Sequence, residues 1–463
     1  LTSHLADYAK HSARIYNAAN YGLDGEGINA AITDAYNNGG GTVIIDGIFN
    51  VDNENIILKP NVSLVGLPGN KINLTNREIQ TDGQPYEFNC VIEGLNLEIH
   101  EDNVAIVTPI RIAGLDAANK CSNVIIRDNV IKCNEEGNHG INIRYAEKID
   151  VYNNAIYDSG QGCGILINDS SNVDVYNNKV YNSGRAGIQV FANCEYIRIH
   201  DNYVYSWMLR RELTDGGIDS YGPYNKNISI YNNIVDTGTT QAMGGARNHL
   251  LFRMQGVHGC YVKNNILIVQ SPTVGQVMRV SERDASEISD GVVFEGNEIY
   301  LKTDAQYIFR GQKTKDWTIR NNKVYSLGGV CLNCAIEVRG NIEELLVDGN
   351  EFKDNLARPL IVVYPTGVKL SNLRIINNTF INQSQRLLML LNIDYPVDTV
   401  MICNNRMETS LGDAIYVYPG IGKLMVTNNY VQCGKGGTPI ANKGTLGEGN
   451  EIIENNFEVV SSS

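Results

Sequence analysis

The chain has 463 residues, of which 43% are hydrophobic, and a formal net charge of −13. This composition excludes a disordered protein, and no apolar stretch approaches the ~18 residues of a membrane span, so we expect no membrane insertion. The acidic balance argues against a nucleic-acid partner, which would require a basic face. Because no basic-then-apolar segment follows Leu1, we expect that a signal peptide has been removed or never existed.

Two N-terminal segments precede the regular part of the chain. Residues 1–22 place Leu5, Tyr8, Ala9 and Ser12 at helical spacing, which predicts a short collar segment that packs on the body or on other subunits. Residues 23–60 predict a helix over 27–37 followed by the strand TVIIDG. The apolar stripe of this helix is Ile28, Ala31, Ile32 and Ala35. A helix across the open end of a parallel sheet covers unpaired backbone, so we interpret 23–60 as a cap.

From residue 61 to 463 the chain repeats. One asparagine returns every 24 to 32 residues, at Asn129, Asn154, Asn178, Asn202, Asn233, Asn265, Asn297, Asn322, Asn350, Asn378, Asn405, Asn429 and Asn456. A repeat of this length predicts a solenoid, here an all-β right-handed parallel β-helix of about 13 or more coils. We expect each repeated asparagine to lie at a bend in left-handed backbone and to hydrogen-bond its stacked counterparts.

Four coils between 120 and 235 align residue by residue. They read HGINIRYAEKIDVYNN, CGILINDSSNVDVYNN, AGIQVFANCEYIRIHDN and GGIDSYGPYNKNISIYNN. The period of two places one row of side chains inside, namely Ile141, Ile165, Ile188 and Ile218. It places the next row outside, namely Asn142, Leu166, Gln189 and Asp219.

The ten cysteines predict core residues rather than a disulfide framework. Cys121 and Cys194 occupy the same coil position three coils apart, which is beyond the reach of a disulfide. Cys331 and Cys334 form a single CxxC without a second pair or a nearby histidine, so we expect no zinc. We predict free thiols, no metal and no cofactor.

The segment DGEGINAAITDAYNNGGGTVIIDGIFNV resembles the opening of the pectate-lyase-like superfamily, and the GI-x-I…NN coils resemble its repeats. The preceding SHLADYAKHSA is similar to collar segments of phage tailspikes and pre-neck appendages from Gram-positive hosts. These resemblances imply a homotrimer, on a virion surface or extracellular, that binds and cuts a cell-surface polysaccharide or teichoic acid. Members of the superfamily include lyases, hydrolases, epimerases and non-catalytic binders, so the reaction is not implied.

The longest coils, with intervals of 31, 32 and 32 residues between Asn202 and Asn297, form the candidate site region. Extra residues leave a solenoid as loops that often wall a binding groove, although tolerated insertions or trimer contacts would give the same lengths. Within this region Asp215, Asp219 and Glu212 are the candidate catalytic carboxylates, since two carboxylates can divide the work of glycoside hydrolysis. Alternatively, Asp215 caps the turn and Asp219 pairs with a neighbouring arginine.

The outward row that Asp219 begins is expected to continue through Arg253, Arg279 and Arg310 to Glu337. Three stacked arginines would repel each other without an anion among them, which predicts a rail for phosphate, uronate or sialate groups. Alternatively, these arginines pair with another subunit or with the loop residues Glu282, Asp284 and Glu287. Glu282 is itself a candidate substrate-binding residue.

Other residues of the region suit a sugar site. Trp207, Tyr221 and Tyr224 are candidates for stacking on sugar faces. His249 and His258 are candidate bases for a lyase or phosphodiesterase, although loop histidines are commonly surface residues. His249 is also a candidate substrate-binding residue.

Superfamily motifs add little to the site. Asn138-His139-Gly140 and Thr214-Asp215-Gly216-Gly217 partly resemble polygalacturonase motifs, but the histidine lies three coils before the aspartates, so that mechanism cannot be carried over. The Asp and His that alginate epimerases place in the strand Gly140–Arg144 are missing, and the stacked aspartates of calcium-dependent pectate lyases cannot be assembled.

The sequence therefore predicts a carbohydrate-active protein, most simply a glycoside hydrolase that depolymerises an acidic or neutral bacterial surface glycan. A polysaccharide lyase or teichoic-acid phosphodiesterase and a non-catalytic glycan-binding adhesin are the alternatives.

Overall fold

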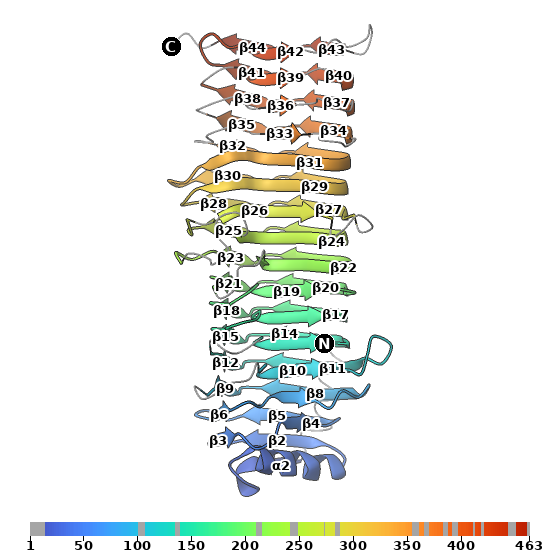
Figure 1. Ribbon diagram of the computed structural model, residues 1–463, viewed down its shortest axis with the longest axis vertical. Helices are drawn as coiled ribbons and strands as arrows, with labels where there is room; N and C mark the ends of the chain where they lie inside the picture. Colours follow the sequence, from blue (N-terminus) through green and yellow to red (C-terminus); the bar gives the residue numbers. More distant parts are fainter. Residues whose placement is uncertain are drawn as a thin grey trace. The chain divides into compact units, whose positions relative to one another are not determined.

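The computed structural model describes residues 14–100, 107–134, 139–209, 215–240, 249–272, 274–282, 288–353, 361–364, 370–382, 388–390, 397–410, 413–417, 421–442 and 451–460. The chain divides into two compact units, Leu1–Asp219 and Ser220–Ser463. Each unit is a parallel β-solenoid (Figure 1), and together they contain about 14 turns. The predicted all-β fold is confirmed.

The first unit begins with a cap. Strand β1 (Ile15–Asn17) pairs in parallel with β2 (Gly41–Ile45), and the 3-10 helix η1 (Ala18–Asn20) leads to helix α2 (Gly25–Asn37). The Asp24 carboxylate accepts the Gly27 N–H and so caps α2. The predicted stripe of α2 is fully buried, against β2 and β4 (Ile56–Leu58), at the end of the sheet stack (Figure 1). The predicted helical segment at Leu5–Ser12 lies outside the described residues.

Three columns of parallel strands form the wall of the first unit, and each full turn adds one strand to each column. The remaining strands are β3 (Ile48–Val51), β5 (Val62–Gly66), β6 (Lys71–Leu74), β7 (Ile79–Thr81), β8 (Glu87–Glu93), β9 (Asn96–Ile99), β10 (Ile110–Ala113), β11 (Cys121–Arg127), β12 (Val130–Lys132), β13 (Ile141–Arg144), β14 (Ala146–Tyr152), β15 (Ala155–Tyr157), β16 (Ile165–Asn168), β17 (Ser171–Tyr176), β18 (Lys179–Tyr181), β19 (Ile188–Phe191), β20 (Glu195–His200) and β21 (Tyr203–Tyr205).

Longer strands distinguish the start of the second unit. Strand β22 (Asp215–Tyr231) begins in the first unit and is followed by β23 (Ile234–Asp236), β24 (His249–Lys263), β25 (Ile266–Val269), β26 (Val274–Ser281), β27 (Asp290–Glu295), β28 (Glu298–Leu301), β29 (Ala305–Arg320), β30 (Lys323–Ser326), β31 (Cys331–Asp348) and β32 (Glu351–Lys353). The later strands are β33 (Ile361–Tyr364), β34 (Leu370–Ile376), β35 (Thr379–Asn382), β36 (Leu388–Leu390), β37 (Val397–Cys403), β38 (Arg406–Thr409), β39 (Ile415–Val417), β40 (Ile421–Thr427), β41 (Tyr430–Cys433), β42 (Ile440–Asn442), β43 (Glu451–Glu454) and β44 (Phe457–Val460).

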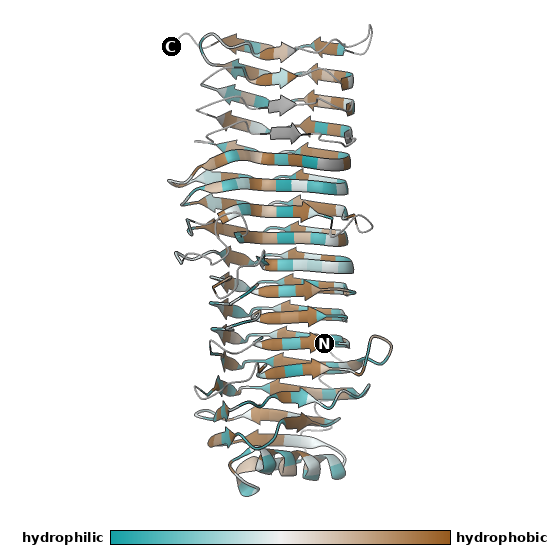
Figure 2. Ribbon diagram, viewed as in Figure 1, coloured by the Kyte–Doolittle hydropathy of each residue, from teal (hydrophilic) through white to brown (hydrophobic). Residues whose placement is uncertain are grey.

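The predicted register is confirmed for the first three of the four aligned coils. Ile141, Ile165 and Ile188 are paired partners in β13, β16 and β19, and all three are fully buried. Asn142, Leu166 and Gln189 form the next row, which points outward by alternation. Figure 2 shows the same alternation of hydrophobic and hydrophilic positions along the strands.

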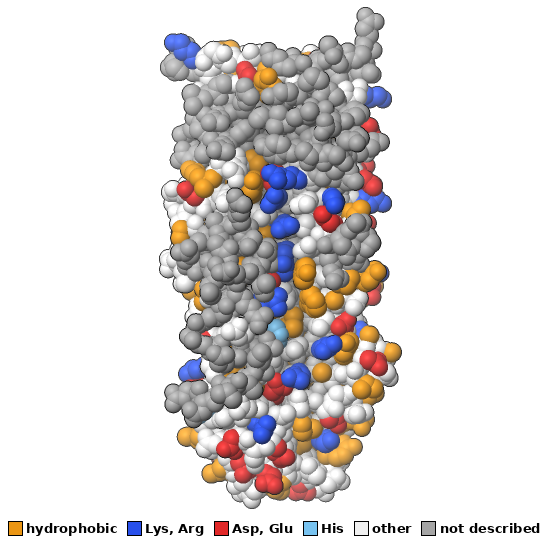
Figure 3. All heavy atoms as spheres, in the orientation of Figure 1, with side chains coloured by type: hydrophobic (Ala, Val, Ile, Leu, Met, Phe, Trp, Pro, Cys, Tyr) orange, Lys and Arg blue, Asp and Glu red, His pale blue; other side chains and the backbone are white. Residues whose placement is uncertain are grey.

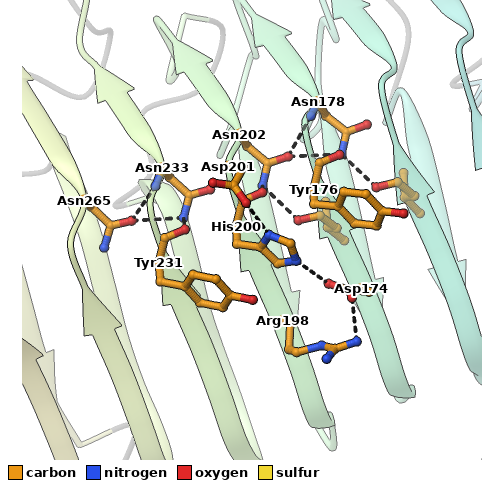
Figure 4. A network of polar contacts seen from close by, with 12 residues as sticks. Asp174, Tyr176, Asn178, Arg198, His200, Asp201, Asn202, Tyr231, Asn233 and Asn265 are labelled. Atoms are coloured by element: carbon orange, nitrogen blue, oxygen red, sulfur yellow. Dashed lines mark hydrogen bonds and ion pairs between the residues drawn. The ribbon is translucent and has the colours of Figure 1, made fainter. Parts of the chain in front are cut away.

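The asparagine ladder is also confirmed, with one correction. Asn178 donates its side-chain N–H to the Asn202 Oδ1 atom at 3.0 Å (Figure 4). Its own Oδ1 atom accepts from Asn154 at 2.9 Å. The ladder asparagines themselves do not adopt left-handed backbone. That conformation, with φ between 54° and 64°, belongs to the residue before each one, namely Asp128, Asn153, Asn177, Asp201, Asn232, Asn264, Gly296, Asn321, Gly349, Asn377, Asn404, Asn428 and Asn455.

All ten cysteines are free and buried, as predicted. Burial raises the pKa of the Cys90, Cys133 and Cys260 thiols to about 12. Across the described ranges, no helix has both the length and the apolar character that crossing a bilayer requires. Nor do three or more His, Cys, Asp or Glu side chains within those ranges form a group that could hold a metal ion.

Candidate functional site

The first unit contains a buried carboxylate cluster, which consists of His139, Cys163, Arg185, Gln189, Asp215 and Asp219. The Arg185 Nε atom lies 3.0 Å from the Asp215 Oδ2 atom, and the Gln189 amide donates to the Asp219 carboxylate at 3.0 Å. Asp215 is 1% exposed and Asp219 0%. Burial of charged groups is costly unless they are paired, and here both carboxylates have a partner.

Further contacts join the cluster to the two preceding coils. The Cys163 thiol lies 3.6 Å from the Gln189 Oε1 atom, and the Cys163 backbone N–H donates to the His139 Nδ1 atom at 3.0 Å. Burial alone would lower the pKa of Arg185, but interactions with Cys163, Asp215 and Asp219 raise it overall. Arg185 therefore stays charged and fixes the position of the Asp215 carboxylate.

The second unit contains the predicted arginine row, which we define as Arg253, Arg279 and Arg310. These residues are paired partners on β24, β26 and β29, and Glu337 on β31 continues the row. Figure 3 shows a run of Lys and Arg side chains, in blue, on the face of the molecule that it draws. Asp219 ends the first unit, so its predicted place at the head of the row stays a prediction.

Glu337 neutralises only one end of the arginine row. Its carboxylate lies 2.6 Å from the Arg310 Nε atom and 2.9 Å from the Arg339 Nε atom, and it is 1% exposed. The guanidinium of Arg253 lies over the Tyr221 ring, 4.3 Å from its centroid. Neighbouring rungs are about 4.8 Å apart, where two like charges repel by about 3 kcal/mol at an effective dielectric constant of about 20.

Of the acidic partners predicted for the row, only Glu282 lies within the described residues. Glu282 forms its ion pair with Lys313 at 3.3 Å, and it also interacts electrostatically with Arg279, which by itself would raise the pKa of that guanidinium. Asp284 and Glu287 fall in the segment 283–287, which the structure does not describe. Glu212 and residues 241–248 likewise lie outside the described residues. Most of the extra residues of the long coils therefore fall outside the part of the chain that the structure describes.

The aromatic candidates have different environments. Trp207 is 1% exposed and its ring is part of the core, so we remove it from the sugar-stacking candidates. One face of Tyr221 is covered by Arg253, whereas Tyr224 is 59% exposed.

The two histidines are strand residues rather than loop residues. His249 is the first residue of β24 and is fully buried, and His258 lies in the same strand and is partly exposed. Burial lowers the pKa of His249 to about 4, so its imidazole is neutral at pH 7. A histidine with so low a pKa is a weak base, which counts against a lyase mechanism through His249.

Sequence reasoning missed Arg185, Gln189 and Cys163 as members of the site. The signal was present in the aligned coils, because Arg185 precedes Ile188 by three residues just as Asp215 precedes Ile218 by three. The alternative prediction was that Asp215 caps the turn and Asp219 pairs with an arginine; in the structure it is Asp215 that forms an ion pair with an arginine, Arg185 of the preceding coil.

The second unit also contains a groove, which lies over the C-terminal halves of its long strands. It has a volume of about 810 Å³ and is lined by His258, Ile288, Asp290, Thr314, Lys315, Asp316, Glu343, Glu344, Ser371 and Asn372. Burial and the nearby carboxylates of Asp290 and Glu344 raise the pKa of Asp316. This acidic groove was not predicted from the sequence.

The family described as "Right handed beta helix region" matches residues 89–235 and 285–457, which is more than half of the chain. The chain belongs to this β-helix family. No functionally curated protein matches it in sequence.

Solved β-helix structures resemble the chain at low sequence identity. A double mutant of the tailspike protein of E. coli bacteriophage HK620, in complex with a pentasaccharide, superposes with a TM-score of 0.54 at 12% identity, over 95% of this chain and 79% of that one. A hyperthermoactive exopolygalacturonase from Thermotoga maritima gives a TM-score of 0.48 at 14% identity, over 75% of this chain and 96% of that one. At 12% identity the similarity to the tailspike protein is one of fold alone.

Proposed function

We propose that this β-helix protein is a carbohydrate-active enzyme that hydrolyses a bacterial surface polysaccharide at the carboxylate cluster. The observation that carries the proposal is the Asp219 carboxylate, which is fully buried on the outward side of its strand and held in one orientation by Gln189. The outward side of a solenoid strand does not require a buried acid for packing. Buried, oriented carboxylates of this kind are typical of sites that transfer protons.

The two aspartates have different hydrogen-bond partners, which suits the division of labour in glycoside hydrolysis. Asp215 forms an ion pair with Arg185 and is the candidate base or nucleophile. Asp219 accepts a hydrogen bond from the Gln189 amide, interacts electrostatically with Arg185, and is the candidate proton donor. Separate environments allow one carboxyl group to act as an acid while the other stays charged. Glu212 is retained as a third candidate.

The tailspike complex with a pentasaccharide supports a glycan as the substrate, since that protein has the same fold and binds an oligosaccharide. Because that protein is a bacteriophage tailspike, we also propose a virion-surface or extracellular location. The homotrimer is proposed on the resemblance of the N-terminal segment SHLADYAKHSA to tailspike collar segments.

The test is incubation of the protein with bacterial surface glycans, followed by product analysis. New reducing ends would indicate a hydrolase, unsaturated termini a lyase and glycerol phosphate a phosphodiesterase. We expect Asp219→Asn to lower kcat by at least about 100-fold with little change in KM, because the amide keeps the shape but cannot transfer the proton.

The matched control is Asp128→Asn, an exposed aspartate in left-handed backbone that asparagine tolerates. Its kcat should equal that of the wild type. Full activity in Asp219→Asn would remove the assignment of this residue.

A second candidate function is glycan binding without cleavage. The observation in its favour is that both carboxylates already have partners, Arg185 for Asp215 and Gln189 for Asp219. A polymer that binds the protein and is recovered unchanged would establish this alternative.

A further inference from the structure

The arginine row has an uneven charge balance, and Arg279 is at its centre. Arg310 is paired with Glu337, which is shared with Arg339. Among the described residues, Arg279 has neither an ion pair nor a hydrogen bond, and its Nε atom is buried. Burial lowers the pKa of Arg279, and the neighbouring Arg310 and Arg253 lower it further. Glu282 offsets part of this effect, but it forms no ion pair with the Arg279 guanidinium among the described residues, so the charge is only partly balanced.

A second buried group next to Arg279 also lacks a partner. Ser281 follows Arg279 by two residues on β26, so both side chains point to the same side of the strand. Ser281 is 1% exposed, and its hydroxyl has no hydrogen-bond partner within the described ranges. Buried hydroxyls are normally satisfied, so this donor and the Arg279 guanidinium point to a missing acceptor.

We propose that Arg279 and Ser281, flanked by Arg253 and Arg310, form an oxyanion-binding subsite, and that the substrate is therefore a polysaccharide with a carboxylate or phosphate group in its repeating unit. This inference rests on the proposed function, which by itself leaves the glycan neutral or acidic.

The chemistry of the subsite selects the ligand. A guanidinium binds the two oxygens of a carboxylate or phosphate through parallel N–H donors, and the serine hydroxyl supplies one further donor. Neutral sugars have no group that would offset the positive charge of the row. Since the rungs follow one another about 4.8 Å apart, a polymer can place successive groups along them.

The experiment titrates the full chain with inorganic phosphate and, separately, with sodium glucuronate, and follows binding by calorimetry; glucose is the neutral probe. We expect one of the two anions to bind, which identifies the source of the oxyanion, and glucose not to bind. Arg279→Gln should weaken that binding by about 10-fold to 100-fold, and Arg279→Lys should restore part of it because the charge remains without the paired donors.

The matched control is Arg320→Gln, which removes an arginine that is paired with Glu295 on the surface of the same unit. It should bind the anion as the wild type does. The inference is overturned if neither anion binds the wild type, or if Arg279→Gln binds as tightly as Arg320→Gln.

The result is separable from that of the proposed function. Anion binding is measured without cleavage, so a chain that binds through Arg279 but cleaves nothing would retain the subsite and lose the hydrolase. A chain that cleaves a glycan with the same kcat/KM in wild type and Arg279→Gln would retain the hydrolase and lose the subsite.

Discussion

Individual side chains show how strongly position in the solenoid alters chemistry. His249 is an ordinary histidine by sequence, yet it is fully buried at the start of β24, and burial lowers its pKa to about 4 from the usual 6.5. The folded protein therefore keeps this imidazole neutral at a pH where the unfolded chain would protonate it.

This difference predicts an acid sensitivity. Because the folded pKa is the lower one, the contribution of His249 to stability is complete above pH 6.5 and is lost as the pH falls to about 4. The shift corresponds to about 3 kcal/mol. We expect His249→Gln to show a smaller fall in unfolding free energy between pH 7 and pH 4 than the wild type, measured by urea unfolding. His258→Gln, in the same strand but partly exposed, is the control and should keep the wild-type slope; the same slope in His249→Gln would contradict the prediction.

At the scale of elements, the bend that carries the ladder asparagine is the repeated stabilising unit. Asn178 donates to the Val151 carbonyl at 2.9 Å as well as to Asn202, and it accepts the Asn154 backbone N–H at 3.0 Å. Each internal asparagine thus satisfies backbone groups of two coils. Its removal leaves several buried polar atoms without partners.

We expect Asn178→Ala to lower the free energy of unfolding by about 3 kcal/mol or more, since buried groups left without partners cost about 1–3 kcal/mol each. Asn456→Ala is the comparison, because Asn456 is partly exposed and the described ladder ends there. Its loss should be smaller. Equal losses in the two variants, measured by urea unfolding, would show that burial of the ladder does not determine its strength.

The elements also show what a sequence can predict. A period of two placed Ile141 inside and Asn142 outside, because side-chain direction in a strand depends only on parity. The left-handed residue was predicted one position too late, since adjacent asparagines such as Asn153 and Asn154 are indistinguishable by composition. Prediction of the Arg185–Asp215 ion pair required the register of the coils and also the conformations of the two side chains, and a sequence repeat does not encode those conformations.

At the scale of the whole molecule, the solenoid is held together without covalent cross-links. All ten cysteines are free and buried. Cys163 belongs to the carboxylate cluster, yet burial raises the pKa of its thiol to about 12, so it is not a nucleophile at neutral pH.

We therefore expect Ellman's reagent to modify almost no thiols in the native protein and ten in urea without a reductant. Addition of a reductant should leave the Tm unchanged, because there is no disulfide to reduce. Fewer than ten reactive thiols in urea would reveal a disulfide and contradict the structure.

The ladder also determines where such a chain can grow. Asn178 and Asn202 are 24 residues apart and joined at 3.0 Å, whereas Asn265 and Asn297 are 32 residues apart and joined at 2.9 Å. The contact is the same although the second coil is eight residues longer, so the added length is accommodated away from the bend. Related proteins can thus differ in the length of the segments that face a ligand, and so in the ligand that they recognise, while the asparagine ladder stays the same.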